Sequence, residues 1–149
     1  MDPASPPLVF RTLTWIGIIE QLQRTRAERI LKPLGLGFPE FSMLVHFSHG
    51  HPPEKTVTGI ASDMQQLQPA VTKTVAKLVA KGFVKAAPNA ADGRSKVLTM
   101  TSKGKAGLAR ALAAMEPPTM AAFGGWSAAE LEQLFAGLDR LKRHLDADR

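Results

Sequence analysis

The spacing of hydrophobic residues in the middle of the chain changes from a helical to a strand-like pattern. Residues 59–65 and 69–81 repeat apolar positions every three or four residues, which predicts two short helices a tight turn apart. Residues 83–87 and 96–100 are strand-like runs, and the sequence between them is turn-forming. Two helices followed by a hairpin predict a winged helix-turn-helix, a layout that reads duplex DNA.

The second short helix is predicted to have two different faces. Its inward stripe consists of Val71, Val75, Leu78 and Val79. The opposite face is small, polar and basic, as suits a helix that lies in a major groove. That face carries Ala70, Thr72, Lys73, Ala76 and Lys77.

Local signals predict where these helices begin and end. Thr58 is expected to cap the first helix through its hydroxyl, directly after a single strand residue at Val57. Pro69 suits the first turn of the second helix, where a missing N–H costs nothing. Gly82 supplies the left-handed residue that ends this helix.

Further helices are predicted on both sides of this central part. A long helix covers residues 8–31, and a short one follows Phe38-Pro39. A third runs from Ser102 to Met115, where Pro117-Pro118 should break or kink it. The short helix after Phe38-Pro39 has an apolar face of Phe41, Leu44, Val45 and Phe47.

The last helix carries a seam of leucines. Ser127 and Glu130 form a capping box at its start. The leucines that follow are spaced 3, 4, 3 and 4 residues apart, a pattern typical of one helix packing against another. They are Leu131, Leu134, Leu138, Leu141 and Leu145.

Positive charge is concentrated in the central segment. Residues 55–110 hold ten Lys and Arg against two acidic residues, a net charge of +8, whereas the whole chain of 149 residues carries +6. A polyanion-binding face is therefore localised. Cysteine is absent, which excludes disulfides and thiolate metal sites, and no apolar run reaches the ~18–20 residues of a membrane span. We expect a cytoplasmic protein.

Three motifs then resemble the multiple-antibiotic-resistance regulator (MarR) family of transcription factors. They are Lys81-Gly82-Phe83-Val84 at the end of the second short helix, Asp92-Gly93-Arg94 at the hairpin tip, and Met100-Thr101-Ser102-Lys103-Gly104 after the hairpin. The resemblance implies a mainly α fold with a small antiparallel β wing and intertwined N- and C-terminal dimerisation helices. It implies one domain over residues 1–149, with dimerisation helices at 8–32 and 102–146 and a DNA-binding lobe at 38–101.

The resemblance also implies a homodimer that binds a pseudopalindromic operator in double-stranded DNA and represses transcription. Thr72 and Lys73 would face the major groove, while Arg94 would enter the minor groove, oriented by Asp92. Gly93 should let the turn at the hairpin tip take a positive φ. The full set of implied DNA-binding residues is Gln68, Ala70, Thr72, Lys73, Lys77, Asp92, Arg94 and Lys96. The five leucines of the last helix would serve dimerisation.

A small aromatic or lipophilic effector is a further expectation from the resemblance. Phe41, Val45, His46 and His49 are candidates to line its pocket, although packing and surface roles remain open for all four. His46, His49 and His51 also suggest a metal, but they lack nearby carboxylates in the right helical phase. We therefore expect no metal site and no cofactor.

Two function classes other than DNA binding compare poorly with the sequence. An enzyme is disfavoured, because the sequence contains no P-loop, G-x-G-x-x-G, G-x-S-x-G or H-E-x-x-H motif. The alternative is a winged-helix dimerisation or protein-interaction module that does not bind DNA. The basic central segment argues against that module, since a protein partner does not require it.

Overall fold

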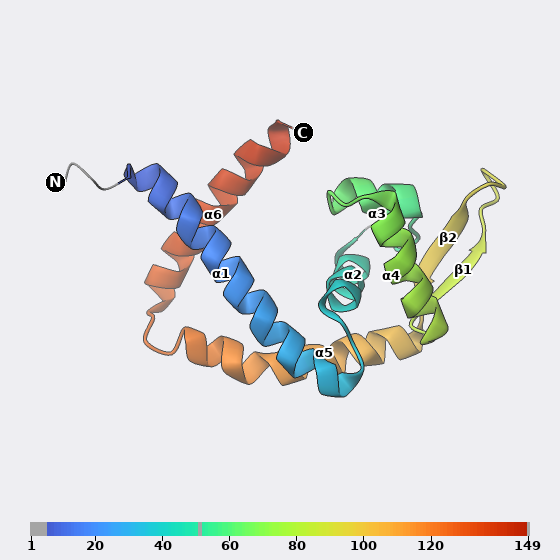
Figure 1. Ribbon diagram of the computed structural model, residues 1–149, viewed down its shortest axis with the longest axis horizontal. Coiled ribbons are helices and arrows are strands. Elements are labelled where there is room, and N and C mark those ends of the chain that lie inside the picture. Colours follow the sequence, from blue (N-terminus) through green and yellow to red (C-terminus); the bar gives the residue numbers. More distant parts are fainter. Residues whose placement is uncertain (1–5, 51, 149) are drawn as a thin grey trace. The chain divides into compact units, whose positions relative to one another are not determined.

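The computed structural model describes residues 6–50 and 52–148 and is mostly helical with one two-stranded sheet (Figure 1). His51 lies outside the described residues. The chain divides into two compact units, Met1–Met115 and Glu116–Arg149, which are described separately. The elements are α1 Leu8–Leu31, η1 Lys32–Leu34, α2 Phe38–His49, α3 Val57–Asp63, α4 Gln68–Ala80, β1 Val84–Pro88, β2 Lys96–Met100, α5 Ser102–Ala122 and α6 Ala128–Ala147.

The first unit contains the hydrophobic core. Helix α2 packs against α1, α4 and β2, and α3 packs against α4. The predicted apolar face of α2 contributes Phe41, Leu44 and Phe47 to the core, with Val45 packed against it. The buried apolar residues are Ala27, Leu31, Leu36, Phe41, Met43, Leu44, Phe47, Ile60, Ala61, Val71, Val75, Leu78, Phe83, Val84, Leu98, Leu108 and Ala111.

Helix α1 is buried only near its C-terminal end, at Ala27 and Leu31. Most of its other apolar side chains are exposed, including Trp15 at 59%, while Ile16 and Ile30 are half-buried. Helix α1 ends at Leu31, and the short η1 that follows it ends where Gly35 takes a left-handed conformation with φ 72°. Helix α2 then begins one residue before Pro39, and the Glu40 carboxylate accepts a hydrogen bond from the Gly37 N–H at 3.2 Å.

The start of α3 differs from the sequence prediction. Lys55, rather than Val57, pairs with β2 through an isolated bridge to Leu98, and Val57 is already helical. The cap is therefore Thr56 and not Thr58: its hydroxyl accepts the Gly59 N–H at 3.1 Å. The turn that follows α3 places Gln65 at φ 52°, a left-handed conformation uncommon for a non-glycine residue.

Helix α4 matches its prediction except at one position. Pro69 lies in the first turn, and Gly82 has φ 73° directly after the helix. Val71, Val75 and Leu78 are buried as predicted, but Val79 is 40% exposed. The fourth buried position is Thr74 instead, because it lies between Val71 and Leu78 on the same face and satisfies its hydroxyl on the Ala70 carbonyl at 3.1 Å.

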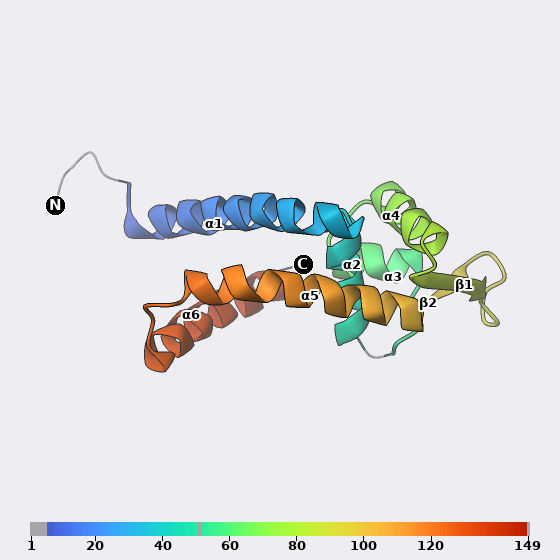
Figure 2. The ribbon, with the colours of Figure 1, turned by 90° about the horizontal axis from the view of Figure 1, so that it is seen from below.

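Strands β1 and β2 form the antiparallel wing. Their register pairs Val84 with Met100 and Pro88 with Lys96. The second strand has the predicted bounds, and the first begins one residue later than predicted. The loop between them projects away from α2 and α3 in both views (Figures 1 and 2).

The beginning of α5 is fixed against the end of α4. The Thr101 hydroxyl donates to the Gly82 carbonyl at 2.6 Å and accepts the Gly104 N–H at 3.0 Å. A Cβ at Gly104 would lie 2.1 Å from the Phe83 carbonyl oxygen, so only glycine permits this approach. Thr101 and Gly104 of the motif after the hairpin thus have a packing reason.

The predicted break at Pro117-Pro118 is wrong, because α5 continues through both prolines to Ala122. Each proline removes one backbone donor. The residues on both sides, mainly Ala, Met and Glu, are strong helix formers that offset this cost.

In the second unit, α6 begins with the predicted capping box. Ser127 N–H donates to the Glu130 carboxylate at 2.7 Å, and the Glu130 N–H donates to the Ser127 hydroxyl at 3.2 Å. Hydrogen bonding of the Glu130 carboxylate to the Ser127 backbone N–H, and then to the Ser127 side chain, holds the pKa of the Glu130 carboxyl below its ordinary value. No described residue of α6 is buried. None of the helices in the described part of the chain is long and apolar enough to span a membrane.

Candidate nucleic-acid interface

Two surface pockets flank the exposed face of α4, and we call them the wing groove and the α2 groove. The wing groove, of about 650 Å³, lies between α3, α4 and the wing. The α2 groove, of about 340 Å³, lies between α4 and the start of α2. All eight sequence-predicted DNA-binding residues are exposed. The structure divides seven of them between these two grooves.

The wing groove brings together Gln68 and Thr72 from α4 with Arg94 and Lys96 from the wing. The two α4 residues precede the two wing residues by more than twenty positions, and the packing of α4 against β1 brings both pairs to one groove. The groove also contains Thr58 and Ser95, which the sequence interpretation did not assign to DNA binding. Nothing in their local sequence distinguishes them from other surface hydroxyl residues.

The α2 groove holds Ala70, Lys73 and Lys77. Lys73 and Lys77 are four residues apart, so they lie on the same face of α4. Thr72 and Lys73 consequently line different grooves, because adjacent residues of a helix lie about 100° apart around its axis. Another overlooked residue is Leu67, the N-cap residue of α4, whose side chain is 79% exposed.

The charges that line the grooves are almost entirely positive. The wing groove has Arg94 and Lys96 and no acidic lining residue. The α2 groove has one acidic lining residue, Glu40, which is buried and paired with Lys81. Lys73 and Lys77 form no ion pair with any described residue. The exposed face of α4 is therefore available to a polyanion.

The wing tip differs from the prediction for Asp92 and Gly93. The Asp92 carboxylate accepts the Arg94 backbone N–H at 3.0 Å, and no ion pair joins it to the Arg94 guanidinium. Asp92 therefore shapes the turn and does not hold the arginine fork. Gly93 was expected to need a positive φ, yet among the described glycines only Gly35 and Gly82 have one.

The effector candidates on α2 lie in different environments. Phe41 is buried in the core and Val45 packs against it, while the His49 ring lies 2.8 Å from the Val45 carbonyl at the surface. His46 is half-buried, and its Nε2 has no hydrogen-bond partner among the described residues. Burial first, then the charge of Lys55, lower the pKa of His46 despite an opposing effect of Asp63 at 3.6 Å.

No group of three or more histidine and carboxylate side chains that could hold a metal occurs in the described ranges 6–50 and 52–148. The predicted effector role of Phe41, Val45, His46 and His49 stays a prediction. Packing accounts for the first two of these residues.

Most of the large apolar side chains that the described residues expose lie on the terminal helices α1 and α6. On α6 these include Leu131, Leu134, Leu138 and Leu145, four of the five predicted seam positions. On α1 the exposed residues are Leu8, Val9, Phe10, Leu13, Trp15, Ile18, Ile19 and Leu22. Exposed apolar surface of this extent is typical of an interaction site.

The helix-turn-helix with its antiparallel hairpin places the chain in the class of winged helix-turn-helix proteins. The sequence model of the MarR family matches residues 34–95, and the resemblance predicted from the three motifs is thereby confirmed. The MarR family consists of transcriptional regulators, which are not enzymes. A search among curated proteins gave no match.

Solved structures show the same fold over nearly the whole chain. The transcriptional regulator BldR from Sulfolobus solfataricus is 23% identical, with a TM-score of 0.79 over 91% of this chain and 94% of that one. A MarR family regulator from Streptomyces coelicolor is 24% identical, with a TM-score of 0.77 over 95% and 98%. Staphylococcus aureus MarR in complex with salicylate and kanamycin is 17% identical, with a TM-score of 0.84 over 95% of each chain.

Proposed function

We propose that this protein is a homodimeric, sequence-specific DNA-binding regulator that represses transcription. The observation that carries the proposal is the exposed face of α4, flanked by two grooves whose cations face no exposed acidic side chain. A helix of this kind enters a major groove, where small and polar side chains reach base edges. A wing beside it suits contact with the neighbouring minor groove or backbone.

The residues take different roles in this proposal. Thr72 in the wing groove and Lys73 in the α2 groove read bases from the two sides of α4. Lys77, one turn further along, contacts phosphate, as does Lys96. Arg94 inserts into the minor groove, where a narrow A·T-rich sequence offers negative potential. Gln68 and Ala70 approach the duplex at the first turn of α4, and Asp92 supports Arg94 through the turn backbone.

The homodimer is supported by the exposed apolar residues of α1 and α6, which a second copy of the chain would cover. Two lobes related by twofold symmetry bind half-sites one helical turn apart, so the operator is a pseudopalindrome. A small effector shifts the population between DNA-competent and incompetent arrangements of the lobes. The salicylate complex of the Staphylococcus aureus relative supports a ligand response.

Selection from a library of random duplexes tests the proposal directly. Repeated binding and amplification with the purified protein should enrich a pseudopalindrome whose half-site centres lie about 10–10.5 base pairs apart. A protein with Lys73 and Thr72 both changed to Ala should enrich no sequence, although it still folds. Failure of the parent protein to retain any duplex would instead favour a protein-interaction module.

A further inference from the structure

Leu67 is the most exposed large apolar residue in the described part of the chain, at 79%. Among the described residues between 38 and 101, only Leu67 and Val79 expose a large apolar side chain. Val79 lines the wing groove, whereas Leu67 directly precedes α4. Its neighbours Gln66 and Gln68 line the α2 groove and the wing groove respectively. Leu67 therefore lies at the start of α4, between residues of the two grooves.

The local rules of helix formation do not explain a leucine at this position. The N-cap residue of a helix is preferably Ser, Thr, Asp or Asn, whose side chain accepts a backbone N–H of the first turn. Leu67 is the N-cap residue of α4 and makes no such hydrogen bond. Its exposed side chain also gains nothing from burial within the chain. Positions that break local rules without a compensating gain are typical of functional sites.

The backbone on both sides of Leu67 is fixed by hydrogen bonds. The Leu67 carbonyl accepts the N–H groups of Ala70 and Val71 at 3.0 and 3.2 Å. The Gln66 N–H, one residue earlier, donates to the Ala61 carbonyl of α3 at 2.9 Å. The exposed leucine is thus carried by an ordered turn between two helices.

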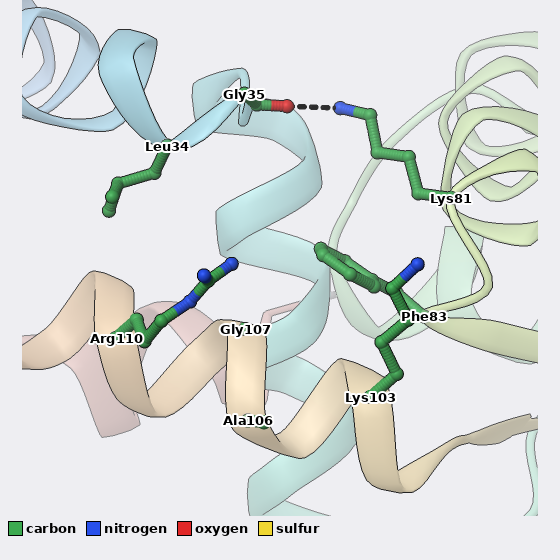
Figure 3. Close-up of a pocket in the computed structure, with 8 residues that line it drawn as sticks. All are labelled: Leu34, Gly35, Lys81, Phe83, Lys103, Ala106, Gly107 and Arg110. Carbon is green, nitrogen blue, oxygen red and sulfur yellow. Dashed lines mark hydrogen bonds between the residues drawn. The ribbon is translucent and has the colours of Figure 1, made fainter.

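The opposite end of α4 is held as well. Lys81 is the C-cap residue of α4, and Figure 3 shows its ammonium donating to the Gly35 carbonyl. The same ammonium pairs with the buried Glu40 carboxylate of α2. Helix α4 is therefore anchored at both ends. An element that is ordered before binding loses less conformational freedom when it meets a partner.

From this placement we propose that Leu67 packs on the C5-methyl group of a thymine in the major groove and selects thymine at that position of each half-site. The inference rests on the proposed DNA-binding function. The first residues of a recognition helix contact base edges, and thymine is the base that presents a methyl group there. A leucine side chain has no hydrogen-bond donor or acceptor, so it contributes neither a polar base contact nor a phosphate contact.

Replacing thymine by deoxyuridine tests this contact, because it removes only the methyl group. The affinities of the full-length protein for the selected operator with thymine and with uracil throughout are compared by fluorescence anisotropy. The parent should prefer the thymine duplex. In Leu67→Ser the ratio of the two affinities should be smaller by about fourfold per half-site, the effect of losing one buried methyl-sized group. Single replacements should assign this loss to one thymine in each half-site.

Two further variants separate the methyl contact from general weakening of DNA binding. Leu67→Met, which keeps an apolar side chain of similar size, should retain most of the preference for thymine. Lys77→Ala should weaken binding to both duplexes and leave their ratio unchanged, because its contact is to phosphate. Comparison of ratios also removes any effect of uracil on the duplex itself.

Thermal melts of the free protein distinguish a DNA contact from a structural role. Leu67→Ser should melt at or above the temperature of the parent, because the serine hydroxyl can accept a backbone N–H of the first turn. A lower melting temperature would assign Leu67 to folding and overturn the inference. Equal ratios for the parent and Leu67→Ser would also overturn it, while leaving DNA binding intact. A parent protein that binds no duplex would refute the proposed function together with this contact.

Discussion

Helices α4 and α6 are both amphipathic, yet they differ in how far their apolar side chains are buried. Helix α4 buries Val71, Val75 and Leu78 in the core of the first unit, and apart from Pro69 and Val79 the residues it exposes are small, polar or basic. Helix α6 buries no described residue and exposes its leucines. The first pattern is that of an element whose packing is complete within one chain. The second is that of an element that needs a partner, because exposed leucines are costly in water.

The largest expected effect comes from charging the α6 seam. Leu138→Asp should cost several kcal/mol of association free energy, because the carboxylate would be buried between helices. Sedimentation of the variant should show monomer or unfolded chain. Gln133→Asp, which adds the same charge on the same helix outside the seam, should remain a dimer. If the parent protein is a stable monomer at micromolar concentration, α6 does not need a partner copy and its contrast with α4 is wrong.

A backbone contact inside the first unit should give the next largest effect. Gly104→Ala places a Cβ 2.1 Å from the Phe83 carbonyl oxygen, so α5 must shift away from the wing. We expect a loss of about 1–3 kcal/mol in the free energy of unfolding, measured by denaturant titration. Gly93→Ala is the control, since a Cβ there meets no atom within 4 Å. Equal stability of the two variants would show that the close approach is not needed.

The exposed face of α4 should affect binding and leave stability unchanged. Lys73→Ala should narrow the difference between operator and random duplex by about 1–3 kcal/mol per half-site, because it loses a base contact. Lys77→Ala should weaken both duplexes about equally. Thermal melts of both variants should match the parent. Equal losses on both duplexes for Lys73→Ala would assign this residue to the phosphate backbone.

The smallest expected effect is on the pH dependence of the free energy of unfolding, through His46 in the first unit. Because the pKa of His46 is lowered from its ordinary 6.5, the unfolded chain takes up this proton first as the pH falls. The neutral imidazole faces Lys55 and Asp63. Stability should therefore decline below pH 6.5, and His46→Gln should make this decline shallower in denaturant titrations. His49→Gln, on the same helix and exposed, should follow the parent; identical slopes for His46→Gln would contradict this account.

Local sequence signals predicted much of this fold. The capping box at Ser127, the left-handed Gly82 and the bounds of α1 and β2 follow from residues close in sequence. The cap of α3 did not, because Thr56 and Thr58 both suit it. The choice depends on the distant bridge between Lys55 and Leu98.

The candidate site was predictable in its residues but less so in its arrangement. The face of α4 follows from helical spacing, and the motifs identify the wing. The division into two grooves depends on tertiary packing, which also places Val79 at the edge of the wing groove. The Asp92 carboxylate accepts the backbone N–H of Arg94 and does not pair with the Arg94 guanidinium. Sequence spacing does not distinguish between these two nearby donors.

The most direct test of DNA binding is the salt dependence of affinity for a duplex, measured by fluorescence anisotropy. Two lobes that neutralise about 6–10 phosphates should lose affinity by roughly 10³–10⁵-fold between 50 and 200 mM salt. The parent protein is expected to show this steep decline on operator and random duplex alike. An affinity that does not change across this range, or no binding at 50 mM salt, would contradict the assignment of α4 and the wing as a DNA-binding surface.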